Sequence, residues 1–145
     1  MISETAMIKN VKMGKNTNIW HFANIYGCKI GENCTIGSYT KIQNDVKLGN
    51  NVIVSSHSFI CSFVDIEDDV FIGHGVITIN DLNPPSRKRT GKEDEWKKTL
   101  IKKGAIIGSG AILFPVTIGR YAKVGAGAVV TKNVPDGAIV IGNPA

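Results

Sequence analysis

The side chains that could take part in a reaction are three histidines, an asparagine–aspartate pair and an arginine that begins a short basic run: His21, His57, His74, Asn80, Asp81 and Arg87. A histidine can take up or release a proton near neutral pH, so it can serve as a general base, and it can also ligate a metal ion. The guanidinium of Arg87 matches phosphate oxygens, although a basic run on an exposed loop is often only solvated. Because these residues are far apart in the sequence, any joint chemistry depends on a fold that gathers them.

An aliphatic residue recurs at every sixth position in the middle of the chain, a period that neither an α-helix nor an ordinary strand has. The run comprises Ile30, Ile36, Ile42, Leu48, Val54, Ile60, Ile66 and Ile72. A second small or branched residue follows four positions after each of them, so every hexad has two inward positions. In four hexads a glycine follows the aliphatic residue, as expected where a short strand turns a tight corner. We therefore predict that each hexad forms one side of a coil, and that three sides make a coil of about 18 residues stacked on the next.

The same spacing continues towards both ends of the chain, with one-residue contractions before Ile30 and Ile118. The array predicts an all-β fold: a parallel β-helix of hexapeptide repeats, with about seven coils in a single domain over residues 1–145. The repeat fails over about residues 79–100, a polar stretch with two prolines and the basic run. We predict that this stretch is a loop extruded from the coils, and we favour a functional role for it because long loops in compact repeats are usually functional or disordered.

Counting along the coils gathers the histidines. A step of 18 residues from His57 leads to Gly75, beside His74. Two coils after His21, allowing for the contraction, the count reaches Ser56, beside His57. The three histidines should therefore project from one face, with His57 and His74 on adjacent rungs about 4.8 Å apart, and the loop should leave one side later. The alternative is a row of solvated imidazoles without a role.

The bulk composition, 145 residues of which 43% are hydrophobic and 20% charged, is that of a folded soluble domain. No apolar run approaches the roughly 20 residues of a membrane span, and the N-terminus lacks the layout of a signal peptide, so we expect a cytoplasmic protein without a membrane partner. The three cysteines lack metal-ligand spacing, and Cys28 and Cys34 fall on small inward positions where packing roles are expected. The net charge of +5 suggests an anionic ligand, whereas dispersed basic residues without a known motif disfavour nucleic acid.

Several short segments resemble those of a known family. They are Thr17–Trp20, Ile66–Gly73 with the following Ile79–Asp81, Val124–Lys132 with the following Val134–Pro135, and Gly142–Ala145. Together with the repeat they resemble the left-handed β-helix acyltransferases over nearly the whole chain. Within that superfamily, the segments around the loop are similar to those of enzymes that N-acetylate amino sugars attached to a nucleoside diphosphate.

The resemblance implies left-handed coils, acetyl-CoA as the acetyl donor with no metal, and a homotrimer with sites between subunits. It implies acetyl transfer to the amino group of a nucleotide-linked sugar, with a dTDP-3-amino-3,6-dideoxyhexose for a surface glycan such as lipopolysaccharide as the preferred acceptor. In such a reaction the neutral amine must reach the thioester carbon and lose a proton as the tetrahedral intermediate forms.

For this reaction His74 is the preferred general base, followed by His57, which could instead bind the sugar. In some relatives the asparagine of the Asn-Asp pair holds the sugar amine and the departing thiolate takes the proton. By that resemblance Asn80 inherits the positioning role, and both routes for the proton stay open. Asp81 is expected either to contact the sugar or to begin an Asx turn that orients the loop.

The remaining predicted contacts are His21 and Arg87 to the substrate, and Gly108, Gly125, Ala126 and Lys132 to the cofactor. The resemblance implies that the pantetheine arm runs along a groove between subunits towards the C-terminal coils. There small residues would bring the backbone close to the arm, and the lysine could meet a phosphate. Tight corners would demand the same small residues.

Other functions fit the scaffold. A different acetyl acceptor, such as a UDP-amino sugar, serine or an antibiotic, would use the same repeat. A γ-type carbonic anhydrase would bind zinc through three histidines, but it needs two of them five residues apart, and His57 and His74 are 17 apart. A β-helix that serves only as a binding scaffold would present flat ranks of one residue type, whereas the exposed positions here are mixed.

Overall fold

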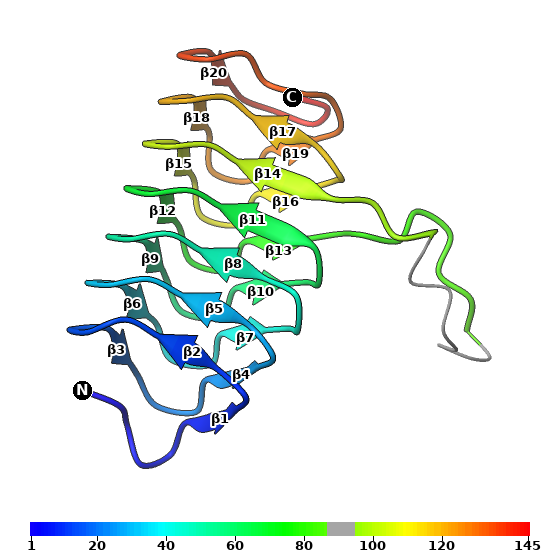
Figure 1. The fold of residues 1–145 in the computed structure, drawn as a ribbon. Coiled ribbons are helices and arrows are strands. Elements are labelled where there is room, and N and C mark those ends of the chain that lie inside the picture. Colours follow the sequence, from blue (N-terminus) through cyan, green and yellow to red (C-terminus); the bar gives the residue numbers. More distant parts are fainter. Residues whose placement is uncertain (87–94) are drawn as a thin grey trace.

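A computed structural model describes residues 1–86 and 95–145, and this part of the chain forms a parallel β-helix built from twenty short strands (Figure 1). Three parallel sheets make its sides. Sheet A contains β3 (Asn18–Ile19), β6 (Thr35–Ile36), β9 (Ile53–Val54), β12 (Phe71–Ile72), β15 (Ile106–Ile107), β18 (Lys123–Val124) and β20 (Ile139–Val140). Sheet B contains β1 (Met7–Lys9), β4 (Asn24–Tyr26), β7 (Lys41–Ile42), β10 (Phe59–Ile60), β13 (Ile77–Thr78), β16 (Ile112–Leu113) and β19 (Val129–Val130). Sheet C contains β2 (Lys12–Met13), β5 (Lys29–Ile30), β8 (Lys47–Leu48), β11 (Val64–Ile66), β14 (Thr99–Ile101) and β17 (Thr117–Ile118).

The chain passes from sheet A to B to C in every coil, so the molecule has three corners, which we name A/B, B/C and C/A after the sheets they join. The N-terminus lies at one end of the stack and the C-terminus at the other (Figure 1). The predicted architecture of about seven coils is confirmed, since sheets A and B each contain seven strands.

The interior is filled by the two inward positions of each hexad. All eight aliphatic residues of the central run are buried, and so are the small residues four positions later, such as Val52 and Val70. Cys28, Cys34 and Cys61 are free thiols buried in this core, which confirms the expected packing role of the first two. Burial raises the pKa of the Cys28 thiol from 9.0 to about 11, because the interior disfavours the thiolate.

The slips in the repeat appear as coils of unequal length. Met7 pairs with Asn24 and Lys12 with Lys29, a register of 17 residues, whereas Lys29 pairs with Lys47 at 18. The pairing of Ile106 with Lys123 returns to 17. A coil can lose one corner residue without moving an inward side chain off its stack, so the core continues through both contractions.

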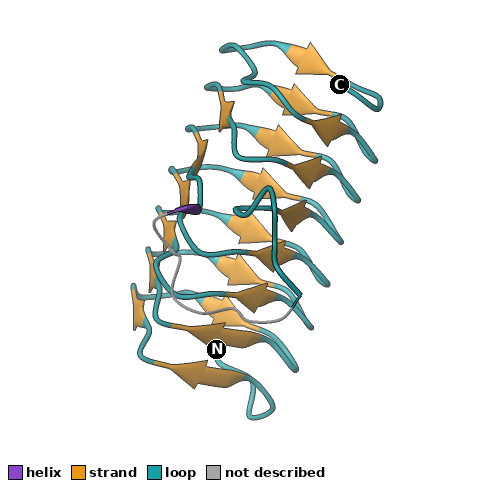
Figure 2. Cartoon of the chain, turned by 90° about the vertical axis from the view of Figure 1, so that its right-hand side faces the viewer, coloured by secondary structure: helices purple, strands orange, loops and turns teal. Residues whose placement is uncertain are grey.

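The predicted loop is also present, and it leaves the coils at the B/C corner, between β13 and β14 (Figure 2). It ends slightly earlier than expected, because Thr99 already pairs with Val64 and is buried at a small inward position. The neck of the loop is closed by a hydrogen bond from the Lys97 N–H to the Asn80 carbonyl oxygen (2.8 Å). In the described residues no helix is long and apolar enough to cross a bilayer.

Candidate functional site

The three histidines lie along the A/B corner, as the count along the coils predicted. Backbone hydrogen bonds fix the order of the rungs. The Tyr39 N–H donates to the His21 carbonyl oxygen, the His57 N–H to the Ser38 carbonyl oxygen, and the Gly75 N–H to the Ser56 carbonyl oxygen. His57 and His74 are therefore on adjacent rungs. They are offset by one residue, as the count also predicted, because His57 occupies the same corner position as Gly75 and not that of His74.

His74 is hydrogen-bonded to both neighbouring rungs. Its Nδ1 lies 2.8 Å from Ser56 Oγ on the rung below, and its backbone N–H donates to Ser109 Oγ on the rung above (3.1 Å). When Nδ1–H donates to the serine, Nε2 keeps its lone pair. The side chain is exposed, so this nitrogen is accessible to a substrate.

His57 and His21 have different surroundings. The ring of His57 stacks on Tyr39, with centroids 5.1 Å apart and planes inclined by 23°. The Nδ1 of His21 lies 2.7 Å from Ser3 Oγ and 3.2 Å from Thr5 Oγ1, which ties it to the N-terminal segment. Three rungs, or about 14 Å, separate His21 from His74, so the two cannot act on one atom.

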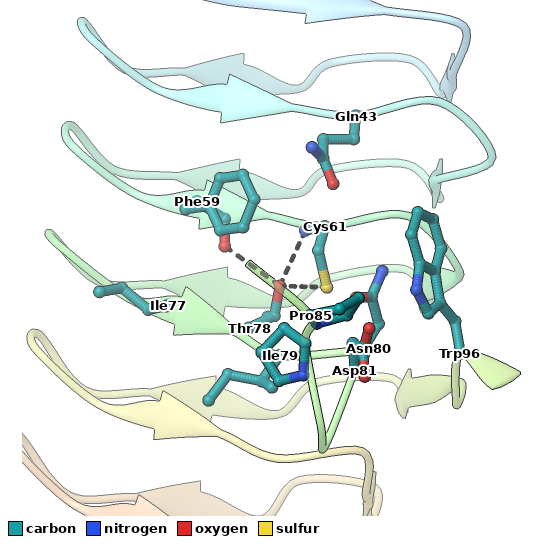
Figure 3. Close-up of a pocket in the computed structure, with 11 residues that line it drawn as sticks. Gln43, Phe59, Cys61, Ile77, Thr78, Ile79, Asn80, Asp81, Pro85 and Trp96 are labelled. Atoms are coloured by element: carbon teal, nitrogen blue, oxygen red, sulfur yellow. Dashed lines mark hydrogen bonds between the residues drawn. The ribbon is translucent and has the colours of Figure 1, made fainter. Parts of the chain in front are cut away.

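A second feature lies at the other edge of sheet B, where the loop covers the outer face of β10 and β13 and leaves a cavity of about 350 Å³. The cavity is lined by Gln43, Phe59, Cys61, Ile77, Thr78, Ile79, Asn80, Asp81, Pro84, Pro85 and Trp96 (Figure 3). Thr78 Oγ1 accepts from the Cys61 N–H (2.8 Å) and donates to the Phe59 carbonyl oxygen (3.1 Å), which fixes the floor. The volume falls within the range of small-molecule sites.

Asn80 belongs to this cavity. Its Nδ2 donates to the Ser62 carbonyl oxygen (3.1 Å), which anchors the loop to the coils. The amide oxygen Oδ1 has no hydrogen-bond partner among residues 1–86 and 95–145, so it can accept a hydrogen bond from a ligand amine.

The other loop residues are held by local contacts. Asp81 Oδ1 accepts from the Asn83 N–H (2.9 Å), so the Asx turn considered for Asp81 is present. Trp96 packs edge-on against Phe63, with centroids 6.0 Å apart, and so holds the returning segment of the loop against the coils. Arg87 lies outside the described residues.

The residues predicted to meet the cofactor fall on two corners. Gly108, Gly125 and Ala126 lie on the A/B corner, where Ala126 is in line with His74 and the two glycines are in line with the preceding Gly73. A Cβ added to Gly108 would lie 2.5 Å from the Ala126 nitrogen, so stacking of the coils alone requires that glycine. Lys132 lies on the B/C corner, after β19, where its side chain is exposed.

The predicted site residues thus form two groups on opposite edges of sheet B: the histidines and small residues at the A/B corner, and Asn80, Asp81 and Lys132 at the B/C corner. One side of the solenoid, about five extended residues or roughly 15 Å, separates His74 from Asn80. Ser56 and Ser109 were not predicted, although the same count that placed the histidines puts Ser56 one coil before His74. In the described part of the chain, no three His, Cys, Asp or Glu side chains are grouped to hold a metal ion.

Comparisons with known proteins agree with this architecture. The model described as bacterial transferase hexapeptide (six repeats) matches residues 10–44 and 27–62, and that described as hexapeptide repeat of succinyl-transferase matches residues 99–132. Together these matches cover more than half of the chain.

Three relatives illustrate the similarity. The bifunctional protein GlmU of Shouchella clausii is 33% identical over 140 residues, which are 94% of this chain and 28% of GlmU. The dTDP-3-amino-3,6-dideoxy-alpha-D-galactopyranose 3-N-acetyltransferase of Aneurinibacillus thermoaerophilus is 47% identical over 53 residues, 36% of this chain and 28% of that enzyme. The structure of the D94A mutant of AntD, an N-acyltransferase from Bacillus cereus in complex with dTDP and coenzyme A, superposes with a TM-score of 0.58 at 26% identity, covering 99% of this chain and 76% of AntD.

The aligned part of the chain spans less than a third of the length of GlmU and of the dTDP-amino-sugar acetyltransferase. From its repeat, its three parallel sheets and these matches, the chain belongs to the hexapeptide-repeat family of bacterial transferases.

Proposed function

We propose that this protein is an acetyl-CoA-dependent N-acetyltransferase whose acceptor is a nucleotide-linked amino sugar, with a dTDP-3-amino-3,6-dideoxyhexose as the preferred acceptor. The observation that carries the proposal is the position of His74. Its imidazole is oriented by Ser56, and on the next two rungs of this corner the left-handed position beside it is occupied by glycine, Gly110 and Gly127. The Cβ position of Gly127 has no atom within 4 Å, which leaves room for a slender pantetheine arm.

In the proposed reaction the neutral sugar amine attacks the thioester carbonyl carbon and a tetrahedral intermediate forms. Nε2 of His74 accepts the proton that the amine nitrogen loses, the carbon–sulfur bond breaks, and the new amide leaves with the sugar. The proton then passes to the departing thiolate, so free CoA is released as the thiol. Direct transfer of the proton to the thiolate would need no base, and the His74 variants described below distinguish the two routes.

The acceptor amine also needs a positioning group, and Asn80 Oδ1 is suited to accept a hydrogen bond from it. Because Asn80 and His74 of one chain are about one side of the solenoid apart, we propose that they meet across the interface of two chains in a homotrimer. An apolar row on the outer face of sheet A supports such an interface: Ile53, Phe71 and Ile106 are in register and are 42%, 39% and 41% exposed. A neighbouring chain that covers this row would bring its loop towards the A/B corner.

The similarity to AntD and to the dTDP-amino-sugar acetyltransferase supports the acceptor class. The test is a thiol-release assay with acetyl-CoA against 3-amino and 4-amino sugars carried on dTDP and UDP, with serine and free glucosamine as other acceptors. Turnover should be fastest with a dTDP-linked amino sugar. Turnover with serine alone, or zinc bound at one ion per chain together with carbon dioxide hydration, would contradict the proposal.

A further inference from the structure

Two side-chain amides in the loop cavity are held by the backbone of the same residue, Ser62, which is buried in the coil. The Ser62 N–H donates to Gln43 Oε1 (3.2 Å), and the Ser62 carbonyl oxygen accepts from Asn80 Nδ2 (3.1 Å). Figure 3 shows the two amides on opposite sides of Cys61, the residue that precedes Ser62. One residue at the B/C corner therefore orients both Gln43 and Asn80.

The two contacts leave opposite groups of the amides free. A backbone N–H must meet an oxygen and a carbonyl must meet an N–H, so each amide can be oriented in only one way. Gln43 is left with the donor Nε2 and Asn80 with the acceptor Oδ1, and neither atom has a hydrogen-bond partner in the part of the chain that the structure describes. Because both residues line the cavity, it has one oriented donor and one oriented acceptor.

The amides reach the same place from different coils. Gln43 directly follows β7 and Asn80 lies two residues after β13, so their backbones are two rungs, about 10 Å, apart. Both side chains extend to the rung of Ser62 between them. A ligand that meets both free groups must therefore have an acceptor and a donor on one small frame.

The other walls of the cavity are mostly apolar. Phe59 and Ile77 lie in register on the outer face of sheet B, beneath the loop. Pro84, Pro85 and Trp96 line the cavity from the loop side. The volume of about 350 Å³ is near the lower end of the range for small-molecule sites, which suits a single sugar ring. With few polar groups in the walls, each of them has a large share in fixing the orientation of a ligand.

Under the proposed function, Asn80 Oδ1 accepts a hydrogen bond from the amine of the acceptor sugar. We propose that Gln43 is a specificity residue for the same sugar: its Nε2 donates to a ring hydroxyl, so the cavity recognises the amine and a hydroxyl together. This inference rests on the proposed function. In a 3-amino-3,6-dideoxyhexose the amine has hydroxyl neighbours at C2 and C4, and the methyl group at C6 matches the apolar floor of Phe59 and Ile77.

A pair of variants separates this role from a purely structural one. Gln43→Met keeps the length of the side chain and removes the donor. Asn44→Ala is the matched control, because Asn44 Oδ1 also accepts from Ser62, through its Oγ (3.3 Å), but Asn44 does not line the cavity. Both variants lose a contact with Ser62, and only Gln43→Met loses the free donor.

The experiment measures dissociation constants by calorimetry for the wild-type protein and both variants, with thermal melting of each. The probes are the dTDP-3-amino-3,6-dideoxyhexose, its 2-deoxy and 4-deoxy analogues, and dTDP. The loss of one neutral hydrogen bond lowers affinity about fivefold. The wild-type protein should bind one of the two deoxy analogues more weakly than the parent sugar by this factor.

Gln43→Met should bind the parent sugar about fivefold more weakly than the wild type does, and should bind that analogue as well as the wild type does. Its affinity for dTDP should be unchanged, because the cavity holds only the sugar. Asn44→Ala should keep the wild-type affinity for every probe.

Equal affinity of Gln43→Met and the wild type for the parent sugar would overturn the inference. An equal loss for every probe would also overturn it, because a distorted corner weakens all of them alike, as would a parent sugar that binds the wild type no more tightly than dTDP does. The binding measurement is independent of turnover. Acetyl transfer to the amino sugar with no effect of Gln43→Met would remove the role of Gln43 and leave the proposed function intact. Sugar binding that depends on Gln43 without any acetyl transfer would remove the function and leave the site.

Discussion

The contact between Ser56 and His74 allows a graded test of the proton transfer. His74→Ala removes the imidazole, whereas Ser56→Ala keeps it and removes only the hydrogen bond of 2.8 Å to Nδ1. Both side chains are at the surface of the coil, so neither change should disturb the buried core.

The expected effects differ in size. A positioned general base contributes about 10²- to 10⁴-fold to the rate, so kcat of His74→Ala should fall by that factor. A single neutral hydrogen bond contributes about 1 kcal/mol, which corresponds to roughly fivefold in rate, so Ser56→Ala should lose about that much. The KM of acetyl-CoA should be unchanged in both variants, because neither removes the open glycine rungs.

The assay is the release of CoA thiol under saturating acetyl-CoA and amino-sugar nucleotide, with circular dichroism to verify folding. Ser38→Ala is the matched control: it is the same substitution on the same corner, one rung below Ser56, and it should leave the rate unchanged. If His74→Ala retains more than a tenth of wild-type kcat, the imidazole is not the proton acceptor and the thiolate route is correct.

Three further predictions follow from other parts of the molecule. Asn80→Ala removes both the free amide oxygen and the anchor to Ser62. In the CoA thiol-release assay kcat should therefore fall by about ten- to hundredfold. An unchanged rate would exclude this amide from the site. Phe71→Glu places a charge in the apolar row of sheet A and should convert the proposed trimer to monomers, as measured by light scattering. Lys47→Glu on sheet C should leave the trimer intact. A trimer in both variants would show that another face is the interface. The free energy of unfolding should decrease between pH 9 and 11, because the Cys28 thiol ionises in this range in the unfolded chain, whereas its pKa in the folded protein is about 11. Cys28→Ala should remove up to about 2 kcal/mol of that decrease, as measured by denaturant titrations at several pH values. An identical pH dependence in the variant would contradict the burial argument.

The fold could be predicted almost completely, because its core is specified by a strict local period. Each inward aliphatic residue, such as Ile36 or Ile60, stacks on its equivalent in the next coil, so the spacing of residues in the sequence is the spacing of side chains in space. The end of the loop was predicted to within two residues, because the inward positions resume at Thr99 and Ile101.

The site was predicted less completely. Counting residues placed His57 and His74 on adjacent rungs, with His57 in line with Gly75, but it does not say which way a side chain on the corner points. The partner of His74 is Ser56, a hydroxyl that looks like any other polar surface residue in the sequence. The stacking of the Phe22, Tyr39 and His57 rings along the A/B corner was also not predicted, because these residues are 17 or 18 positions apart in the sequence.

In the proposed reaction the amine is held by Asn80 of one chain and deprotonated by His74 of another. Co-expression of His74→Ala chains with Asn80→Ala chains tests it directly, because each variant alone is predicted to be nearly inactive. In randomly mixed trimers about a quarter of the interfaces combine the intact histidine with the intact asparagine, so the mixture should recover up to about a quarter of wild-type turnover. A mixed preparation no more active than its two parents would contradict a site shared between chains.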